Sequence, residues 1–472
     1  MWVSIAIIVF YIIGLLSAVN AVMTTRTSQG AIAWVLSLIT FPFIAVPAYW
    51  VFGNSRFNGY AKARNSNNAE VEKKLVETLK VLEPYHLDKS TKSLQGDVIE
   101  RLADLPFLSH NTVDLLIDGE SVFGSIIEGL NSATSYILFQ FYIVHDDTIG
   151  EKIKECLIAK AKEGVKIYFL YDEIGSHDLG DVYKNDLKKS GIAVHSFHTQ
   201  KGKGNRFQLN FRNHRKVVVV DGKTAWIGGL NVGDEYLGRD EKVGNWRDTH
   251  MKITGPAAIA VQVSFSEDWH WATGGIVPEI GWMPTPSKGG NANILIVPSG
   301  PADELETVSL MFLHAINSAK ERIWIATPYF VPDYAILFAL QLAVLRDVDV
   351  RIMVPDKSDN LLVNLSFYTY LEEPNLKGVR FFRYADGFLH EKVMLIDHAA
   401  ATVGTANFDN RSFRLNFEIT GLVSDQEFIE KVEEMFINDF KLSLETTKSD
   451  MDKKPFWFKL MARLARLTSP VQ

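Results

Sequence analysis

The chain has 472 residues, with 49 Lys and Arg against 56 Asp and Glu, which gives a formal net charge of −7. At roughly 100–200 residues per domain, this length allows two or more domains or one large duplicated unit. An overall basic field is missing, which disfavours a nucleic-acid-binding protein. The single cysteine, Cys156, excludes an intrachain disulfide framework and a zinc site built on paired cysteines.

Two runs near the N-terminus, residues 2–22 and 31–52, contain no charged residue. Each is long enough for a helix, which needs ~20 apolar residues to cross a ~30 Å hydrocarbon core. The turn between the runs carries one cation, Arg26, whereas several follow the second run, beginning with Arg56 and Lys62. By the positive-inside tendency, we predict a transmembrane hairpin over residues 1–53, with both termini cytoplasmic and the turn outside.

A cleaved signal peptide is the alternative for the first run, because Val19-Asn20-Ala21 loosely resembles a cleavage site. The run lacks a basic start and a second apolar run follows at once, so we favour the hairpin. Pro42 and Pro47 lie inside the second run. Membrane helices tolerate proline, which can kink them.

The segments at either end of the main body differ in character. Residues 54–107 are largely polar and are predicted to form a tether. In residues 447–472, apolar side chains recur at helical spacing opposite basic ones; the apolar set is Trp457, Leu460, Met461, Leu464 and Leu467, and the basic set is Lys459, Arg463 and Arg466. Two interpretations stay open, a helix lying on an anionic bilayer surface and a terminal helix docked on the body.

The middle of the chain contains an internal repeat. Asn-Ser-Ala at 131–133 precedes an apolar, strand-like stretch, and the same triplet at 317–319 precedes another. A helix-like stretch and a further strand follow in each copy. This alternation predicts an α/β fold made of two similar halves, residues 108–290 and 291–446.

Each half contains one H-x-K-x4-D pattern. Because strand side chains alternate between faces, the histidine and lysine of each pattern point the same way and can contact one ligand. Downstream, an asparagine lies 17 residues after each histidine, so the flanks match as well. The residues are His214, Lys216, Asp221 and Asn231 in the first half, and His390, Lys392, Asp397 and Asn407 in the second.

The plain alternative makes each histidine a packed strand residue and each lysine a solvated one. Four apolar residues follow each lysine, however, which indicates a buried strand where an unpaired lysine is expensive. Two buried lysines beside two histidines require an anionic partner, and a phosphate fits.

These paired patterns resemble the phospholipase D superfamily. The N-terminal runs and the stretches at 228–236, 246–250, 329–333 and 407–413 resemble the bacterial cardiolipin synthases, over nearly the whole chain. The resemblance implies that two halves related by a pseudo-twofold axis bring both motifs into one pocket. One departure is His398, which stands where the first motif has Gly222 and alters the turn after the strand.

The resemblance further implies a membrane-bound transferase of the bacterial cell membrane, which joins two phosphatidylglycerol molecules into cardiolipin and releases glycerol. No metal, cofactor or nucleic acid takes part. A phospholipid hydrolase and a phosphatidylserine-forming transferase carry the same motifs and remain competitors. A non-catalytic membrane scaffold and a nuclease are disfavoured, the first by the intact motifs and the second by the charge and the apolar runs.

Phosphodiester transfer needs a nucleophile, a proton donor and neutralisation of the phosphoryl oxygens. From chain order in related enzymes we expect His214 as the nucleophile and His390 as the acid and base. The predicted donors to the phosphate oxygens are Lys216, Lys392, Asn231 and Asn407.

Each histidine also needs an acceptor for its second nitrogen. The candidates are Asp248 and Glu418, but the sequence does not tell which carboxylate serves which histidine. By resemblance, Asp221 and Asp397 brace the site, and their plain alternative is a turn role.

Other aromatic and histidine side chains carry weaker expectations. Tyr142 and Tyr329 occupy matching places after repeat strands and are candidates for lining the pocket. The remaining histidines singled out lack the lysine two residues on and are expected on the surface or in the packing; they are His145, His177, His195, His198 and His250.

Overall fold

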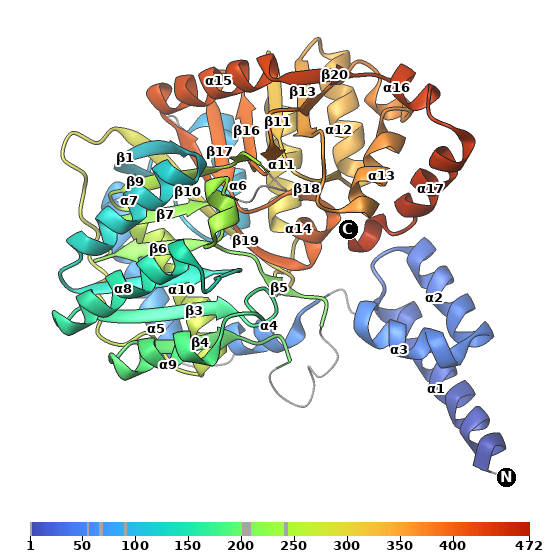
Figure 1. Cartoon of the computed structure of the whole chain (residues 1–472), viewed down its shortest axis with the longest axis horizontal. Coiled ribbons are helices and arrows are strands. Elements are labelled where there is room, and N and C mark those ends of the chain that lie inside the picture. The colour runs from blue at the N-terminus through green and yellow to red at the C-terminus, as the bar shows by residue number, and fades with distance from the viewer. Residues whose placement is uncertain (1, 54–55, 66–68, 89–91, 201–208, 240–243) are drawn as a thin grey trace.

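The computed structural model describes residues 2–53, 56–65, 69–88, 92–200, 209–239 and 244–472. The two halves of an α/β body lie side by side, and one apolar helix at the N-terminus points away from them (Figure 1). The predicted α/β class and the duplicated architecture are both observed.

The first half begins with a long strand and alternates strands with helices. In chain order, its elements are β1 (Leu108–Ile117), α7 (Asp118–Ser132), β2 (Tyr136–Phe141), α8 (Thr148–Lys162), β3 (Lys166–Asp172), α9 (Asp181–Lys189), β4 (Ala193–Phe197), β5 (Arg212–Asn213), β6 (Val217–Val220), β7 (Thr224–Gly228), the 3-10 helix η5 (Asp234–Leu237), β8 (Trp246–Arg247), β9 (Thr249–Thr254) and α10 (Ala257–Thr273).

The second half repeats this order. Its elements are β10 (Ala292–Ser299), α11 (Thr307–Ser318), β11 (Arg322–Ala326), β12 (Phe330–Val331), α12 (Tyr334–Leu345), β13 (Asp349–Pro355), α13 (Leu361–Tyr370), η6 (Pro374–Leu376), β14 (Arg380–Tyr384), β15 (Phe388–Leu389), β16 (Val393–Ile396), β17 (Ala400–Gly404), β18 (Phe408–Asp409), α14 (Asn410–Arg414), β19 (Asn416–Ser424), α15 (Gln426–Lys441) and β20 (Ser443–Thr446).

One sheet runs through both halves. From the centre outward, the first half has the order β1-β9-β7-β6-β2-β3-β4, and the second has β10-β19-β17-β16-β11-β13-β14-β20. Corresponding strands therefore occupy corresponding places about the antiparallel β1–β10 pair. The parallel runs β2-β3-β4 and β11-β13-β14 lie at the two outer ends, where crossover helices cover them.

Two short strand pairs cross between the halves and position the site. The residues just before His214 form β5, which pairs in parallel with β19 of the second half. The residues just before His390 form β15, which pairs in parallel with β8 of the first half. Each motif histidine thus directly follows a short strand that pairs with a strand of the opposite half.

The predicted second membrane span is not a single helix. The first apolar run forms α1 (Trp2–Thr24), which among the described residues is the one helix long and apolar enough to span a membrane. The second run divides into α2 (Ser28–Thr40) and α3 (Pro42–Phe52). Pro42 is the cause, because a proline disfavours the helical conformation of the residue before it, and Phe41 has φ −131° and ψ 58°.

The turn between the two apolar runs lies against the body. Arg26 forms a 3.0 Å ion pair with Glu306, at the start of α11 in the second half. The structure therefore does not show the expected hairpin, in which this turn lies on the opposite side of the membrane from the body.

Much of the segment expected to be a tether packs on the body. Its elements are α4 (Asn58–Asn65), α5 (Ala69–Leu82), η1 (Glu83–Tyr85), η3 (Ser93–Gln95) and α6 (Gly96–Ala103). Phe57 is fully buried against Phe211 and Phe417, and the Tyr60 hydroxyl donates to Asp268 at 2.9 Å. Few but large apolar side chains hold this polar segment in place, so it is no free linker.

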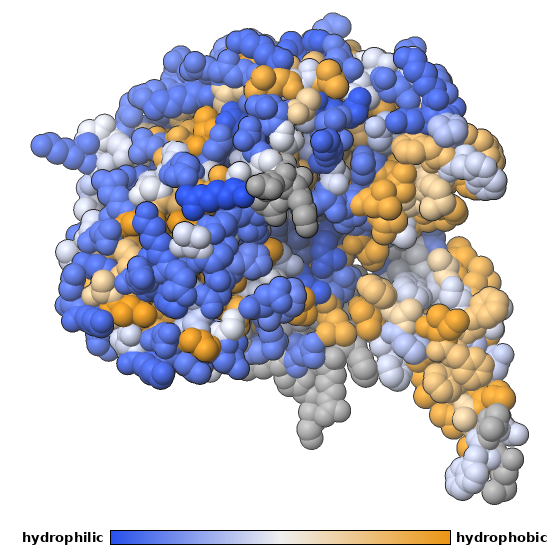
Figure 2. Space-filling view, in the orientation of Figure 1, coloured by the Kyte–Doolittle hydropathy of each residue, from blue (hydrophilic) through white to orange (hydrophobic). Residues whose placement is uncertain are grey.

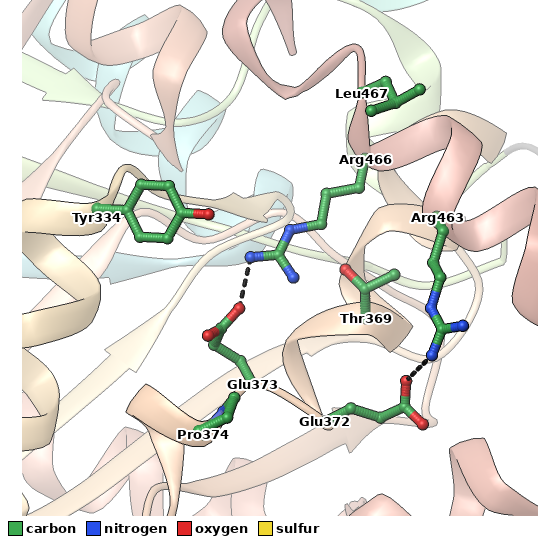
Figure 3. A pocket seen from close by; sticks show the side chains of 8 residues that line it. All are labelled: Tyr334, Thr369, Glu372, Glu373, Pro374, Arg463, Arg466 and Leu467. Carbon is green, nitrogen blue, oxygen red and sulfur yellow. Dashed lines mark hydrogen bonds and ion pairs between the residues drawn. The ribbon is translucent and has the colours of Figure 1, made fainter. Parts of the chain in front are cut away.

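The C-terminal segment forms α16 (Lys448–Asp452), α17 (Phe456–Arg466) and η7 (Ser469–Val471). Helix α17 packs on α13, and two ion pairs, Arg463–Glu372 and Arg466–Glu373, flank a cavity of about 400 Å³ between them (Figure 3). The docked interpretation of this helix is thus observed. Its outer apolar side chains remain exposed, and apolar surface gathers over this region and over the N-terminal helices in Figure 2.

Candidate active site

Each H-x-K pattern leads into a fully buried strand, β6 or β16. The alternation of side chains is visible around His214. Asn213 and Arg215 both contact Asp268, at 2.8 Å and 3.0 Å, on one side. His214 and Lys216 point to the other side, where the Lys216 Nζ lies 5.4 Å from the ring centre of Tyr142. The strand therefore presents its histidine and lysine together, as the two-residue spacing predicts.

His214 is held by a carboxylate from the second half. Its Nδ1 lies 2.9 Å from Glu418 Oε2 and 3.1 Å from Oε1. Glu418 lies on β19, the strand that pairs with β5, and is fully buried. The Asn416 side-chain amide donates to Glu418 Oε1 at 3.1 Å and fixes the carboxylate in turn.

His390 is held in the reciprocal way. Its Nδ1 lies 2.7 Å from Oδ2 of Asp248, which directly follows β8 of the first half. The backbone N–H of Thr249 donates to the other carboxylate oxygen at 2.7 Å. Because an Nδ1–H donated to a carboxylate leaves Nε2 as the basic nitrogen, both imidazoles have a free Nε2 when neutral.

The two lysines lie beside their histidines. The Lys216 Nζ donates to the His214 carbonyl at 2.7 Å, and the Lys392 Nζ donates to the His390 carbonyl and lies 2.8 Å from His390 Nδ1. Lys392 Nζ is also 4.0 Å from Asp248 Oδ2. Besides burial, the charge of Lys392 lowers the pKa of Lys216, and the charges of Lys216 and His214 lower the pKa of His390, so both motifs contribute to one site.

Burial and repulsion between cationic groups lower the pKa values of the lysines and histidines of this site. Burial lowers the pKa of Lys216 to about 7 and that of Lys392 to about 8. Burial also lowers the pKa of His214, which Glu418 partly opposes, and it lowers that of His390 well below 6.5, with Lys392 and Lys216 adding to the effect. An anion that binds here raises the pKa values of these lysines and histidines and so favours their charged forms.

Asp221 and Asp397 are not brought to the histidines. They follow β6 and β16, at the opposite strand ends from His214 and His390. Asp221 accepts from the backbone N–H groups of residues 134–136, and Asp397 accepts from those of residues 320–322. Both residues have positive φ, +54° and +50°. The motif aspartates thus join the turns after β6 and β16 to the starts of the neighbouring strands in the sheet, β2 and β11.

The backbone conformation of the turn after Asp221 also explains why residue 222 is a glycine. Its φ is +65°, and a Cβ there would lie 2.4 Å from the Tyr136 hydroxyl. His398, in the corresponding place of the second half, is exposed and contacts Arg322 at 3.0 Å. The departure noted in the sequence therefore changes a turn remote from the histidines.

The two asparagines are buried, and each already has protein partners. Asn231 accepts from the backbone N–H of Ile143 at 3.2 Å and donates to the Tyr236 hydroxyl at 3.0 Å. Asn407 donates to Asp409 Oδ2 at 3.3 Å. A side-chain amide has two N–H groups, so these contacts leave each asparagine one donor for a ligand.

Aromatic rings contact both imidazoles. The Tyr142 ring lies 5.1 Å from the His214 ring at an interplanar angle of 66°. His390 of the second half contacts the ring of Trp246, from the first half, at 5.1 Å, and that of Phe388 at 5.8 Å. The matching residue of the repeat, Tyr329, instead donates to Asp359 at 2.8 Å. The sequence pairs Tyr142 with Tyr329, and only the crossed β8–β15 contact identifies Trp246.

The other histidines lie outside this arrangement, with one exception. His145 and His198 pair with Glu235 and Glu173, and His195 packs on Trp269, while His177 is exposed beside Asp178. His250 is buried two residues after Asp248, and its Nδ1 has no hydrogen-bond partner within the described part of the chain. Burial lowers its pKa to about 4, and both site lysines act on it, so His250 is a neutral packing residue near the lysines.

A duplicated α/β sheet that brings two H-x-K motifs together defines the phospholipase D class of proteins. A family model described as "Cardiolipin synthase, PLD-like domain" matches residues 126–269 and 312–440. The chain is 45% identical over 464 residues to cardiolipin synthase A of Pseudomonas putida (strain W619), covering 98% of this chain and 96% of that protein. It is also 45% identical to cardiolipin synthase A of Pseudomonas aeruginosa (strain LESB58), over 98% of this chain and 94% of that one.

Among solved structures, phosphatidylserine synthase of Haemophilus influenzae Rd KW20 has the same fold. The TM-score is 0.61 at 16% sequence identity, over 80% of this chain and all of that one. At this identity the likeness shows the fold alone. The near full-length relatives are decisive, and the chain belongs to the family of PLD-like cardiolipin synthases.

Proposed function

We propose that this protein transfers a phosphatidyl group between two phosphatidylglycerol molecules, giving cardiolipin and glycerol. The observation that carries the proposal is the pair of largely buried imidazoles, His214 and His390, each with Nδ1 on a carboxylate of the opposite half and with a lysine beside it. One such imidazole can attack phosphorus while the other moves a proton.

In the first step, the His214 Nε2 attacks the phosphorus of one phosphatidylglycerol, and the bond from phosphorus to the glycerol oxygen breaks. His390 gives its proton to the departing glycerol. In the second step, the glycerol hydroxyl of another phosphatidylglycerol gives its proton to His390 and attacks the same phosphorus, so the phosphorus–nitrogen bond breaks. Cardiolipin leaves and both imidazoles return to their starting state.

The charges at the site support this assignment of proton transfers. Lys392 lies 2.8 Å from His390 Nδ1, so charge on both groups is unfavourable in the empty site. A phosphodiester between the lysines favours their charged forms and raises the pKa of His390. We infer that His390 takes up the proton needed for the first step from solvent when the anionic substrate binds, and that Lys216, Lys392, Asn231 and Asn407 donate to the phosphate oxygens.

A product assay tests the activity. The purified full chain is given phosphatidylglycerol as the sole lipid and the products are identified by mass spectrometry, for the wild type, His214→Ala, His390→Ala and the exposed control His177→Ala. We expect cardiolipin from the wild type and the control only. Phosphatidate without cardiolipin from the wild type would instead identify a hydrolase of the same class.

The assignment of the nucleophile has its own test. In His390→Ala, the phosphatidyl group transferred to His214 lacks the base that activates its acceptor, so the covalent intermediate should accumulate. Peptide mapping of the trapped protein should place the phosphate on His214. Phosphate on His390 in the reciprocal variant His214→Ala, and none on His214, would reverse the roles.

For location, we propose the cytoplasmic membrane of a bacterium, with the body on the cytoplasmic side and one crossing by α1. Helices α2 and α3 run along only part of α1. The turn between them lies at mid-helix, where a Cβ on Gly14 would be 2.6 Å from the Leu38 carbonyl oxygen and Phe43 packs on Phe10. From there α3 returns, since the Tyr49 hydroxyl donates to Asn20 at 2.7 Å near the end of α1.

This path supports a re-entrant pair rather than a second crossing. Helix α2 has 13 residues and α3 has 11, about 20 Å and about 17 Å at 1.5 Å per residue, against a ~30 Å core. Phe57, just beyond α3, donates its backbone N–H to Pro301 of the body at 2.9 Å. With Arg26 and Arg56 both on the body side, the flanking cations follow the positive-inside tendency better than in a hairpin.

For partners, we propose that α17 also contacts the anionic bilayer surface while it stays docked on α13. Phe456, Trp457 and Leu467 are each at least 70% exposed and lie on the helix side away from the body. Arg463 at the edge is 66% exposed. An apolar face with basic residues at its border is typical of a helix at a membrane interface.

A further inference from the structure

The proposed reaction places a second anion next to the first. The acceptor phosphatidylglycerol carries its own phosphodiester, and in the product the two phosphates are joined by one three-carbon glycerol unit. While the acceptor hydroxyl attacks phosphorus on His214, its own phosphate must therefore lie only a few bonds away. Lys216 and Lys392 are engaged with the reacting phosphate, so other cations must accept the second one. The inference rests on the proposed function.

Two arginines from opposite halves meet at one turn beside His214. Arg212, in β5, donates to the carbonyls of Leu209 and Phe211. Arg411, in α14, donates to the side-chain oxygen of Asn210 at 3.1 Å and to its carbonyl at 2.7 Å. Both guanidinium groups are thus anchored to the three residues 209–211.

Arg212 is on the same face of the strand as the motif residues. Asn213 and Arg215 point to Asp268 on the other side, so Arg212, His214 and Lys216 share one face. Successive side chains on a strand face are about 7 Å apart. That spacing suits two phosphates joined through glycerol.

Tyr142 connects the arginines to the histidine. Its ring lies 5.1 Å from the His214 ring, and the charge of Arg212 acts on its hydroxyl. The charge of Arg411 also acts on Tyr142, and those of Tyr142 and Glu418 act on Arg411. The two guanidinium groups therefore lie at the edge of the same site.

Their charges are not compensated by an ion pair. Throughout the described ranges, no carboxylate oxygen lies within 4.0 Å of either guanidinium, and the partners found are neutral carbonyl and amide oxygens. Arg215 and Arg247, also at the junction of the halves, are by contrast paired with Asp268 and Asp439. Burial and the charge of Arg212 lower the pKa of Arg411, and the more distant Asp409 and Glu418 oppose this only in part.

We propose that Arg212 and Arg411 bind the phosphodiester of the acceptor phosphatidylglycerol and so select a lipid acceptor that carries a phosphate. Guanidinium groups suit this task because their planar N–H pairs match two phosphate oxygens. The acceptor glycerol then extends from this second phosphate toward the phosphorus on His214, and its hydroxyl gives its proton to His390.

Comparison of two acceptors tests the site. Transfer to phosphatidylglycerol needs the second phosphate, whereas exchange of labelled glycerol into phosphatidylglycerol uses an acceptor without a phosphate. For Arg212→Gln and Arg411→Gln we expect kcat/KM for cardiolipin formation to fall roughly 10- to 100-fold, as for loss of a charge-assisted hydrogen bond, with glycerol exchange unchanged. Arg380→Gln, which breaks an exposed ion pair with Glu445, is the control and should alter neither.

An equal loss of both reactions would overturn the proposal, since it would indicate a structural role at the 209–211 turn. Two unaffected reactions would overturn it as well. If a glutamine variant does not fold, Arg411→Lys keeps the charge and should raise the acceptor KM while exchange persists. Failure of the wild type to form cardiolipin while it exchanges glycerol would instead refute the proposed function.

Discussion

The imidazole of His214 and the carboxylate of Glu418, 204 positions apart in the chain, meet at 2.9 Å between Nδ1 and Oε2. His390 and Asp248, 142 positions apart, repeat the contact in the opposite direction. Each half therefore supplies one imidazole and the carboxylate that orients the other imidazole. Neither motif histidine is paired with a carboxylate of its own half, so the two halves form one site.

The crossed carboxylates can be tested one at a time. Glu418→Gln removes the acceptor charge at His214 and permits the wrong tautomer, and Asp248→Asn does the same at His390. We expect kcat for cardiolipin formation to fall about 10²- to 10⁴-fold in each. The matched control is Glu427→Gln on the exposed face of α15, which should retain activity. Full activity in Glu418→Gln would contradict the bracing role.

The pH dependence follows from the lowered pKa values. Before substrate binds, the pKa of Lys216 is about 7 and that of Lys392 is about 8, and the pKa of His390, which must gain a proton for the first step, is lower still, so kcat/KM should decline as pH rises toward and through this range. Bound phosphate keeps both lysines charged, so the alkaline limb of kcat should lie at higher pH than that of kcat/KM. The acid limb should lie below 6.5, since burial lowers the pKa of His214. Coincident alkaline limbs for the two parameters would contradict this coupling.

The motif aspartates should affect stability rather than chemistry. Asp221→Ala leaves the backbone N–H groups of residues 134–136 without their acceptor. We expect a loss of about 1–3 kcal/mol in the free energy of unfolding, with kcat per folded molecule unchanged. Asp221→Asn should lose less, because asparagine tolerates positive φ and keeps one acceptor oxygen.

The pH dependence of that stability has a definite sign. Burial opposes ionisation of Asp221, but hydrogen bonds from residues 134–136 outweigh it and lower its pKa below 3.8. Its stabilising contribution is therefore complete above 3.8 and disappears as pH falls through the lowered value. Unfolding measured against pH should show wild type and Asp221→Ala converging in strong acid. A kcat loss as large as that of His214→Ala would contradict the structural role.

Thiol labelling can determine on which side of the membrane each of these segments lies. In a Cys156→Ser background, single cysteines at Trp2→Cys, Ser28→Cys and Lys453→Cys are exposed to a membrane-impermeant maleimide in intact cells. One crossing by α1 predicts labelling of Trp2→Cys alone, with the other two labelled only after permeabilisation. A transmembrane hairpin predicts the reverse for Trp2→Cys and Ser28→Cys. Labelling of Ser28→Cys in intact cells would therefore exclude the re-entrant pair.

Helix α17 should act on access to lipid rather than on chemistry. Phe456→Ser with Trp457→Ser removes two exposed apolar side chains without touching the Arg463 and Arg466 ion pairs. In mixed micelles we expect the apparent KM for phosphatidylglycerol to rise several-fold at unchanged kcat. Val182→Ser, an equally exposed apolar residue on α9, is the control. An unchanged KM in the double variant would exclude a role of α17 at the bilayer.

Local pattern predicted the parts of the fold whose causes are local. Four apolar residues after Lys216 and after Lys392 are buried as β6 and β16, and the turn role considered for Asp221 and Gly222 is the one observed. The repeat indicated two halves, and the matched spacing selected the histidines and lysines. Local pattern misled where a few residues outweighed composition. Pro42 divided the second apolar run, and Phe57 and Tyr60 held a polar segment on the body.

The sequence by itself thus determined which groups we propose as carrying the chemistry, because strand alternation places His214 with Lys216 and His390 with Lys392 on one face each. Only the tertiary structure decided that Glu418 serves His214, that Asp248 serves His390 and that Trp246 contacts His390. Those pairings depend on β5 with β19 and β8 with β15, strands from opposite halves. Strand pairing of such long range is set by the packing of the two halves, and no local spacing encodes it.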